Sequence, residues 1–335
     1  MGIHNLNKVL KKYYTPVARK SAYFKTKKIA FDASLLMYQY LIAIRSEGVQ
    51  LSAGDSSTSH INGFFYKVIN LVESGIKPVF IFDGKALEIK SQEILKRNER
   101  RAEAEKKYSE AEQIGDKEQM AKFDKRKMKI TQEHCDEIKR LLTHMGVPFL
   151  NSENEAEALC VQLCKEKVVD FVCTEDMDAL CFGAPYLLRN PKKNEFQEYN
   201  LKEILEKIDM TFEQFVDFCI LLGCDYAGTL PGIGVVRAEN LIRKHQNIEN
   251  ILTELEITDY DFKHAREAFF TLKSKYDLKT VSINWTAYNR ENVVQFLQEK
   301  GFDEKRVSTA LDRYEKCKSA NKGNQIRLTD MFKKK

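Results

Sequence analysis

The sequence predicts an α/β fold in which a central, mostly parallel sheet is flanked by helices on both faces. Short apolar runs such as "KIAF", "VFIF" and "FVC" have the length and the β-branched and aromatic content of buried strands. Segments with helical spacing of apolar residues separate these runs. The chain has 335 residues, of which 43% are hydrophobic and 31% charged, so it can bury a sizeable core.

The first half supplies most of this sheet. Residues 27–41, "KKIAFDASLLMYQYL", are expected to form a strand that runs into a helix, and residues 77–83 form a second strand. Residues 133–150 combine a helix, which Gly146 ends, with the strand "VPFL". A helix over 153–166 and the strand "DFVCT" follow, and residues 186–199 are expected to form a hairpin closed around "PKKN".

The second half is expected to be helical. A helix over 212–222 opens with the capping-box pair Thr211 and Gln214 and ends at Gly223. We expect helices up to about residue 315 and a flexible, basic tail after it. The predicted units are residues 1–84 and 132–210 for the core, 85–131 for a charged insertion, 211–315 for the helical region and 316–335 for the tail.

Acidic residues follow the predicted strands. Asp32 and Asp83 each end a strand, and Asp176 and Asp178 follow "FVCT" two residues apart, so an extended backbone would point both the same way. Glu155 and Glu157 begin the helix after "VPFL", and Asp225 is available as a seventh carboxylate. Because the carboxyl ends of parallel strands share one edge, these acids are expected to meet there.

Each acid also has a structural explanation on its own. Asp32 suits a helix N-cap, Asp83 before Gly84 suits a turn, and Glu155 and Glu157 suit the positive end of a helix dipole. Together they would repel one another unless cations neutralise them. Oxygen ligands without histidine select Mg²⁺ or Mn²⁺, and so many acids suggest two ions, an arrangement typical of phosphodiester hydrolysis.

A glycine turn, "PGIGVVRA", lies between two predicted helices. Gly232 and Gly234 would let backbone N–H groups approach a phosphate, and the alternative is a plain helix-hairpin turn. The basic residues that follow favour contact with DNA: Arg237, Arg243, Lys244 and His245.

Charge and cysteine usage limit the other classes of function. The net charge is +5, but residues 316–335 alone carry +6, so total charge does not itself indicate nucleic acid binding. The eight cysteines lie mostly in apolar segments and are expected to be reduced, in an intracellular protein. We expect no signal peptide, no membrane span and no myristoylation, since position 6 is Leu.

These motifs resemble those of the flap endonucleases, structure-specific 5′ nucleases, nearly end to end. The resemblance rests on "FDASLLMYQYLIAIR", "FIFDGK", "KRNERRAEAEK", "SENEAEA", "TEDMDAL" and "LLGCDYAGTLPGIG". It implies a helical arch over residues 85–131, through which a 5′ flap threads, and a helix-hairpin-helix-type DNA-binding region. It also implies Mg²⁺-dependent 5′ flap endonuclease and 5′–3′ exonuclease activity in DNA replication, including Okazaki fragment maturation, and in base excision repair.

The resemblance assigns roles to individual residues. The seven acids match metal ligands, Lys90 and Arg97 match contacts to the scissile phosphate, and Gly2 lies close to the active site. K⁺ is expected at the glycine turn, where Val235 and Val236 replace a usual lysine. The DNA-binding residues implied are Tyr38, Arg45, Thr58, Lys90, Arg97, Arg100, Arg101, Gly232, Gly234 and Arg237.

The tail contains "QIRLTDMF", residues 325–332, which is similar to the motif that binds the sliding clamp PCNA. Gln325, Leu328, Met331 and Phe332 would make the contacts, and Met331 replaces the usual first aromatic, so weaker binding is expected. The resemblance further implies a monomer that acts in the nucleus, with mitochondria and the nucleolus as further locations. Two alternatives stay open: a sister 5′ nuclease (exonuclease, excision nuclease or junction resolvase), and a catalytically silent junction binder or clamp adaptor.

Overall fold

A seven-stranded mixed sheet forms the centre of the computed structural model, which describes residues 2–43, 52–53, 56–85, 90–192, 195–271, 276–278, 281 and 283–323. The strand order is β1-β9-β8-β7-β2-β5-β6. The strands are β1 (Val17–Lys20), β2 (Lys28–Asp32), β5 (Lys77–Phe82), β6 (Phe149–Asn151), β7 (Phe171–Cys173), β8 (Tyr186–Lys192) and β9 (Glu195–Asn200). A separate pair joins β3 (Ser52–Ala53) to β4 (Ser56–Ser57).

Five strands of this sheet run parallel, which confirms the predicted fold class. Strand β2 lies between β5 and β7, and β6 and β8 extend the parallel part on either side. The hairpin β8–β9 and the edge strand β1 are antiparallel. The carboxyl ends of β2, β5, β6 and β7 therefore share one edge, as the sequence predicted.

Side chains alternate between two hydrophobic cores, one on each face of the sheet. In β2, Ile29 and Phe31 enter one core and Ala30 the other. The first core is covered by α2 (Ala33–Ala43), α3 (Ser59–Glu73), α6 (Gln132–Met145), α14 (Arg290–Glu299) and α15 (Glu304–Gly323). The second is covered by α1 (Leu6–Tyr13), α7 (Ala156–Lys165), α8 (Asp178–Cys181), α9 (Leu201–Ile208) and α10 (Phe212–Leu222).

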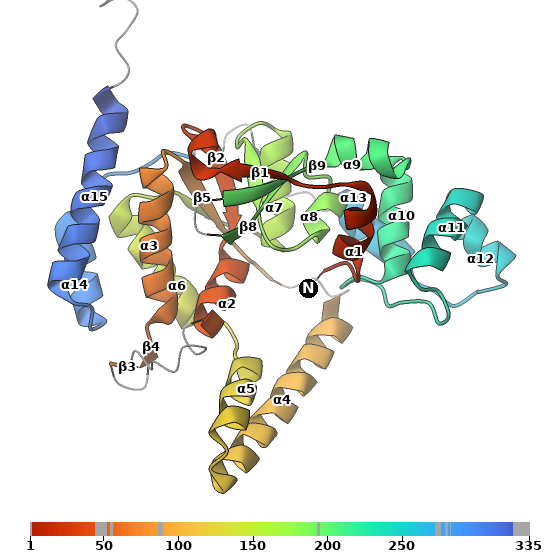
Figure 1. Cartoon of the computed structure of the whole chain (residues 1–335), viewed down its shortest axis with the longest axis horizontal. Coiled ribbons are helices and arrows are strands. Elements are labelled where there is room, and N and C mark those ends of the chain that lie inside the picture. Colours follow the sequence, from red (N-terminus) through yellow and green to blue (C-terminus); the bar gives the residue numbers. More distant parts are fainter. Residues whose placement is uncertain are drawn as a thin grey trace, which may run out of the picture.

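Two helices leave the body as a pair, which we call the arch. These are α4 (Ser91–Ile114) and α5 (Lys117–Lys127), and both lie in the charged insertion 85–131. Gly115 ends α4 in the left-handed conformation, and the Asp116 side chain caps α5 by accepting two backbone N–H groups. Figure 1 shows the arch projecting below the sheet, with its base beside the N-terminus.

The region after residue 200 differs from the expectation in two ways. Helices α11 (Val235–His245), α12 (Ile248–Glu254) and α13 (Lys263–Thr271) extend the second core, but α14 and α15 pack on α6 and α3 at the opposite end (Figure 1). The predicted helical region 211–315 is thus divided between two faces. Helix α15 also continues to Gly323, so residues 316–323 are helical and not part of a flexible tail.

A buried histidine makes the stability of this fold sensitive to acid. His60 on α3 accepts or donates a hydrogen bond at Glu137 (2.7 Å), and its ring lies edge-on to His134. Burial, reinforced by His134 and opposed by Glu137, lowers the pKa of His60 to about 4. Because the folded pKa lies below the unfolded value near 6.5, the contribution of His60 to stability is fully present above pH 6.5 and falls by about 3 kcal/mol as pH falls to 4.

We therefore expect the free energy of unfolding of His60→Gln, measured by urea titration, to rise relative to that of the parent chain by about 3 kcal/mol between pH 6.5 and 4. The matched control is His264→Gln, since His264 is exposed and lies outside this cluster; its free energy of unfolding should follow the parent curve across this pH range. Parallel curves for His60→Gln and the parent would contradict the prediction.

Candidate active site at the sheet edge

Seven acids gather at the carboxyl edge of the parallel strands, and we call them the acid cluster. Six of them line a cavity of about 960 Å³ between the sheet edge and the base of the arch. The seventh, Asp178, is buried beside Asp176 and accepts a hydrogen bond from the N–H of Ile3. The cluster consists of Asp32, Asp83, Glu155, Glu157, Asp176, Asp178 and Asp225.

Backbone N–H groups hold several of these carboxylates in place. The N–H of Leu35 donates to Asp32 (3.0 Å), the N–H of Ala156 donates to Asp83 (2.8 Å), and the N–H of Ile3 donates to Asp178 (2.8 Å). Because these donors lie in three separate segments, the folded chain fixes the spacing of the acids.

Asp176 and Asp178 converge by a different geometry from the one the sequence suggested. The backbone between them is not extended, because Met177 has helical angles and Asp178 is the first residue of α8. The N–H of Asp178 donates to Asp176 Oδ1 (3.1 Å), and the N–H of Asp176 donates to Thr174 Oγ1 (3.1 Å). A tight turn therefore brings the two acids together.

The N-terminal segment completes this corner of the site. Gly2 has a φ of 79°, and a Cβ atom added there would lie 1.9 Å from Asp176 Oδ1 and 2.3 Å from Asp178 Oδ1. Only glycine therefore fits at this position without displacing the acids.

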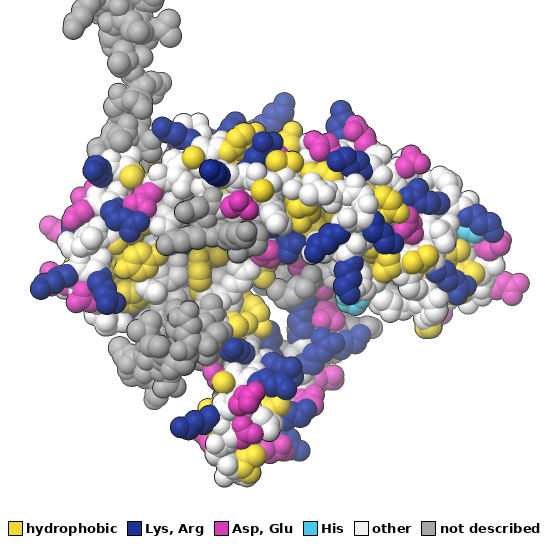
Figure 2. Space-filling view, in the orientation of Figure 1, with side chains coloured by type: hydrophobic (Ala, Val, Ile, Leu, Met, Phe, Trp, Pro, Cys, Tyr) yellow, Lys and Arg dark blue, Asp and Glu magenta, His cyan; other side chains and the backbone are white. Residues whose placement is uncertain are grey.

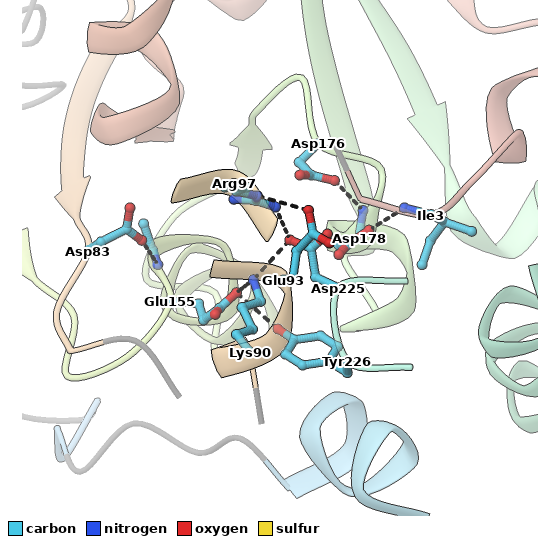
Figure 3. A network of polar contacts seen from close by, with 11 residues as sticks. Ile3, Asp83, Lys90, Glu93, Arg97, Glu155, Asp176, Asp178, Asp225 and Tyr226 are labelled. Atoms are coloured by element: carbon cyan, nitrogen blue, oxygen red, sulfur yellow. Dashed lines mark hydrogen bonds and ion pairs between the residues drawn. The ribbon is translucent and has the colours of Figure 1, made fainter. Parts of the chain in front are cut away.

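Two basic side chains at the base of the arch, from the N-cap and the second turn of α4, reach into the acid cluster (Figure 3). Lys90 Nζ forms an ion pair with Glu155 and lies 3.5 Å from Asp225 Oδ2. Arg97 Nη2 donates to the same Asp225 oxygen at 2.6 Å. Burial opposes the positive charge of Lys90, but Glu155 and Asp225 outweigh it and raise the pKa of Lys90 above its usual value.

Two cations do not neutralise seven acids, and three of the buried carboxyl groups have raised pKa values. Burial and the nearby Asp83 raise the pKa of Asp32 to about 7. Burial with Asp32 raises the pKa of Glu157 well above its usual range, and burial with Asp176 does the same for Asp178. These three carboxyl groups therefore resist ionisation unless more positive charge enters the cavity.

Sequence reasoning missed two side chains that shape this site. Tyr226 donates to Glu155 Oε2 (2.9 Å), and its ring lies 4.9 Å from Lys90 Nζ, so it orients both members of that ion pair. Glu93 accepts from Arg97 Nε (3.2 Å) on the same face of α4. The position of Tyr226 directly after Asp225 was the available signal.

The other predicted site residues fall into three groups. Tyr38, Arg100 and Arg101 line the same cavity as the acids, and Figure 2 shows Lys and Arg side chains along the arch and around its base. Thr58 is buried where α3 begins, away from the lining of that cavity. Arg45 and the four clamp-motif residues, Gln325, Leu328, Met331 and Phe332, lie outside the described residues.

The glycine turn lies between α10 and α11. Gly232 has a φ of 75° and Gly234 is the N-cap of α11, while exposed Arg237 donates to the Gly232 carbonyl (3.1 Å). Arg243, grouped with the DNA-facing residues by sequence, instead donates to the Ile208 carbonyl (2.8 Å) and pairs with a glutamate of its own helix.

Known proteins with the same sequence organisation identify the family. The XPG N-terminal domain description matches residues 1–104, and the XPG I-region description matches residues 146–225. The chain is 47% identical to flap endonuclease 1 of Encephalitozoon cuniculi over 339 residues, which cover 98% of both chains. The chain belongs to the flap endonuclease family.

Other flap endonucleases and solved structures agree with this assignment. The flap endonuclease 1 of Xiphophorus maculatus is 44% identical over 99% of this chain and 90% of its own. The structure of flap endonuclease-1 from Methanococcus jannaschii matches with a TM-score of 0.72 and 30% identity, covering 91% of this chain and 98% of that chain. The catalytic core of Rad2, solved in complex with a DNA substrate, shares the fold with a TM-score of 0.73.

Membership makes this chain a 5′ flap endonuclease, and flap endonucleases are metal-dependent nucleases that use a divalent ion. The acid cluster fits such an ion, since it offers only oxygen ligands and its seven carboxyl groups outnumber the two cations that reach them. Within the residues that the structure describes, however, no three acidic, histidine or cysteine side chains already enclose an ion position. Lys90 and Arg97 hold some of the oxygens instead, so both would have to withdraw from Glu155 and Asp225 to free these ligands.

In the described part of the chain, no helix has both the length and the apolar character needed to cross a membrane.

Proposed function

We propose that this flap endonuclease cuts the phosphodiester near the junction of 5′-flap DNA, and also degrades DNA from 5′ ends, with two Mg²⁺ ions held by the acid cluster. Mn²⁺ would substitute for Mg²⁺. The observation that carries the proposal is one cavity lined by six carboxylates and two cations from the base of the arch, with Asp178 buried beside them. When bound, the ions would help to ionise the attacking water and stabilise charge on the phosphate.

The arch residues have two alternative partners in this proposal. Lys90 and Arg97 are paired with Glu155 and Asp225 through flexible side chains, and both line the cavity that a scissile phosphate would enter. A guanidinium binds two phosphate oxygens in a fixed fork, whereas an ammonium acts as a compact charge. We infer that both side chains turn from the acids to the phosphate, which positions it at the acid cluster.

The remaining DNA contacts follow from where the residues lie. Tyr38 would stack on the base at the cut, while Arg100 and Arg101 would contact the flap inside the cavity. The turn at Gly232 and Gly234 would bind duplex phosphates with Arg237 and a K⁺ ion. Arg45 and Thr58 would hold a short 3′ flap.

A labelled double-flap DNA tests this function directly. We expect cutting within about one nucleotide of the junction in Mg²⁺, and none in Ca²⁺ or EDTA. Gap, bubble and four-way junction DNA of the same length serve as controls, since preference for one of these would indicate a sister nuclease. Binding to the flap without cutting in any metal would instead indicate a junction-binding platform.

We further propose that the chain is a monomer that binds PCNA through residues 325–332 and acts in the nucleus, with mitochondria and the nucleolus as further locations. In that setting it would serve DNA replication, through Okazaki fragment maturation, and base excision repair. The similarity of "QIRLTDMF" to the clamp-binding motif supports the clamp contact.

Phe332→Ala is expected to weaken capture of the chain by immobilised PCNA at least tenfold, because an aromatic anchor is lost. Cutting without the clamp should be unchanged. Phe270→Ala is the matched control, since Phe270 is an exposed phenylalanine on α13 and outside the motif. Loss of clamp-free cutting in Phe332→Ala would show that the tail contributes to the nuclease body.

A further inference from the structure

Three aromatic rings surround one lysine at the C-terminal end of α15. The ammonium of Lys318 lies 5.2 Å from the ring of Trp285, 5.5 Å from that of Tyr288 and 5.2 Å from that of Tyr314. All three distances fall within the range over which an aromatic face attracts a cation. We call these three rings the aromatic cage.

The cage is built on the rigid body of the protein. Tyr314 is fully buried, packs edge-on to Tyr288 with the ring centres 5.3 Å apart, and donates to the Met145 carbonyl (2.7 Å). The segment that carries Trp285 and Tyr288 is fixed to the end of α6 by two backbone hydrogen bonds. These run from the N–H of Thr286 to the Gly146 carbonyl (3.2 Å) and from the N–H of Asn289 to the His144 carbonyl (2.9 Å).

Ion pairs hold the preceding turns of α15 to the body. Arg313 makes a two-pronged contact with Glu73 of α3, at 2.7 and 2.5 Å. Arg290, at the start of α14, contacts Asp312 (2.8 Å) and Glu315 (3.1 Å). Lys318 thus extends a series of contacts along α15, and it lies one to two turns before the helix ends at Gly323.

The position of this helix end determines the length of the tether that follows. Only Asn324 separates Gly323 from Gln325, where the clamp motif begins. Figure 1 shows that the C-terminal end of α15 points away from the arch. If α15 unfolded beyond Glu315, residues 316–323 would add about eight residues to the segment that joins the body to the clamp motif. The effective concentration of the bound clamp at the nuclease would then be much lower.

We propose that the aromatic cage is a cation-binding site whose ligand is Lys318, and that it fixes the point and direction in which the tail leaves the body. The nuclease and the clamp would then be coupled through a short, defined tether. The coupling between nuclease and clamp rests on the proposed binding of PCNA through residues 325–332, whereas the anchoring of Lys318 does not.

The anchor itself is tested without the clamp. Trp285 is the only tryptophan in the chain, so its fluorescence reports on the cage alone. Lys318→Met should change the emission of Trp285 and speed hydrogen exchange of the amides in residues 316–323 about tenfold. Lys318→Arg should restore both to the parent values, and Lys305→Met, which removes an exposed lysine from the same helix, should alter neither. Unchanged emission and exchange in Lys318→Met would overturn the anchor.

The coupling is tested on flap DNA loaded with PCNA. Lys318→Met should leave clamp-free cutting and the affinity for PCNA unchanged, but lower the stimulation by PCNA about threefold to tenfold, following the increase in tether length. Stimulation equal to that of Lys305→Met would overturn the coupling. If the parent chain itself fails to bind PCNA, the proposed clamp contact and the coupling both fail, whereas fluorescence and exchange still decide whether Lys318 anchors α15.

Discussion

Asp178→Asn is expected to reduce cleavage of flap DNA by about 10³-fold or more while leaving binding of the DNA nearly unchanged. The Asp178 carboxylate is buried in the acid cluster and does not line the cavity, so we expect it to contact a metal ion and not the DNA. An asparagine keeps the shape and can still accept the hydrogen bond from the N–H of Ile3. It removes the negative charge that would hold the ion.

The measurement is single-turnover cutting in Mg²⁺ beside flap binding in Ca²⁺. Asp209→Asn is the matched control, because Asp209 is almost fully exposed and remote from the cluster; it should cut at the parent rate. Normal cutting by Asp178→Asn would show that the metal assignment is wrong, and an equal loss of binding and cutting would show that Asp178 supports the DNA site as a whole.

Arg97→Ala is expected to slow the chemical step about 10²- to 10³-fold and to weaken flap binding by less than about threefold. Arg97 reaches into the cavity from α4 and pairs with Asp225 at 2.6 Å, within the group of acids that would hold metal. Its guanidinium would meet the phosphate where charge develops during the reaction, so its effect should be larger on the transition state than on the bound substrate.

The single-turnover rate and the dissociation constant of the flap separate these effects. Arg97→Lys should recover only part of the rate, because an ammonium lacks the planar fork. Lys96→Ala removes a charge from the neighbouring exposed position of α4 and should leave the rate near that of the parent. A loss of binding as large as the loss of rate would identify Arg97 as a phosphate anchor that does not act in the chemical step.

The sequence alone was sufficient to place the acids at one edge. Asp32 and Asp83 follow strands whose apolar residues are nearly continuous, and such strands pair in parallel with their carboxyl ends together. The capping pair Thr211 and Gln214 likewise determined where α10 begins, since both halves of the capping box are formed. These features depend on local patterns and on one general rule of sheet topology.

Other features depend on contacts between distant segments, and local patterns carry no signal for them. The ion pairs that bring the arch into the site join residues 65 and 128 positions apart, Lys90 with Glu155 and Arg97 with Asp225. The turn that brings Asp176 and Asp178 together differs from the extended backbone predicted there, because an apolar run does not show where its strand stops.

The sequence by itself determined the α/β class, every strand of the central sheet except β1, the acids at the strand ends and the family. Only the tertiary structure decided that β1 joins β9 at the sheet edge, that α14 and α15 separate from the other helices after residue 210 to cover α3 and α6, and that Lys318 enters the aromatic cage. The physical reason is that an apolar helix face or an unpaired strand must be covered, but its amino acids do not specify which distant surface covers it.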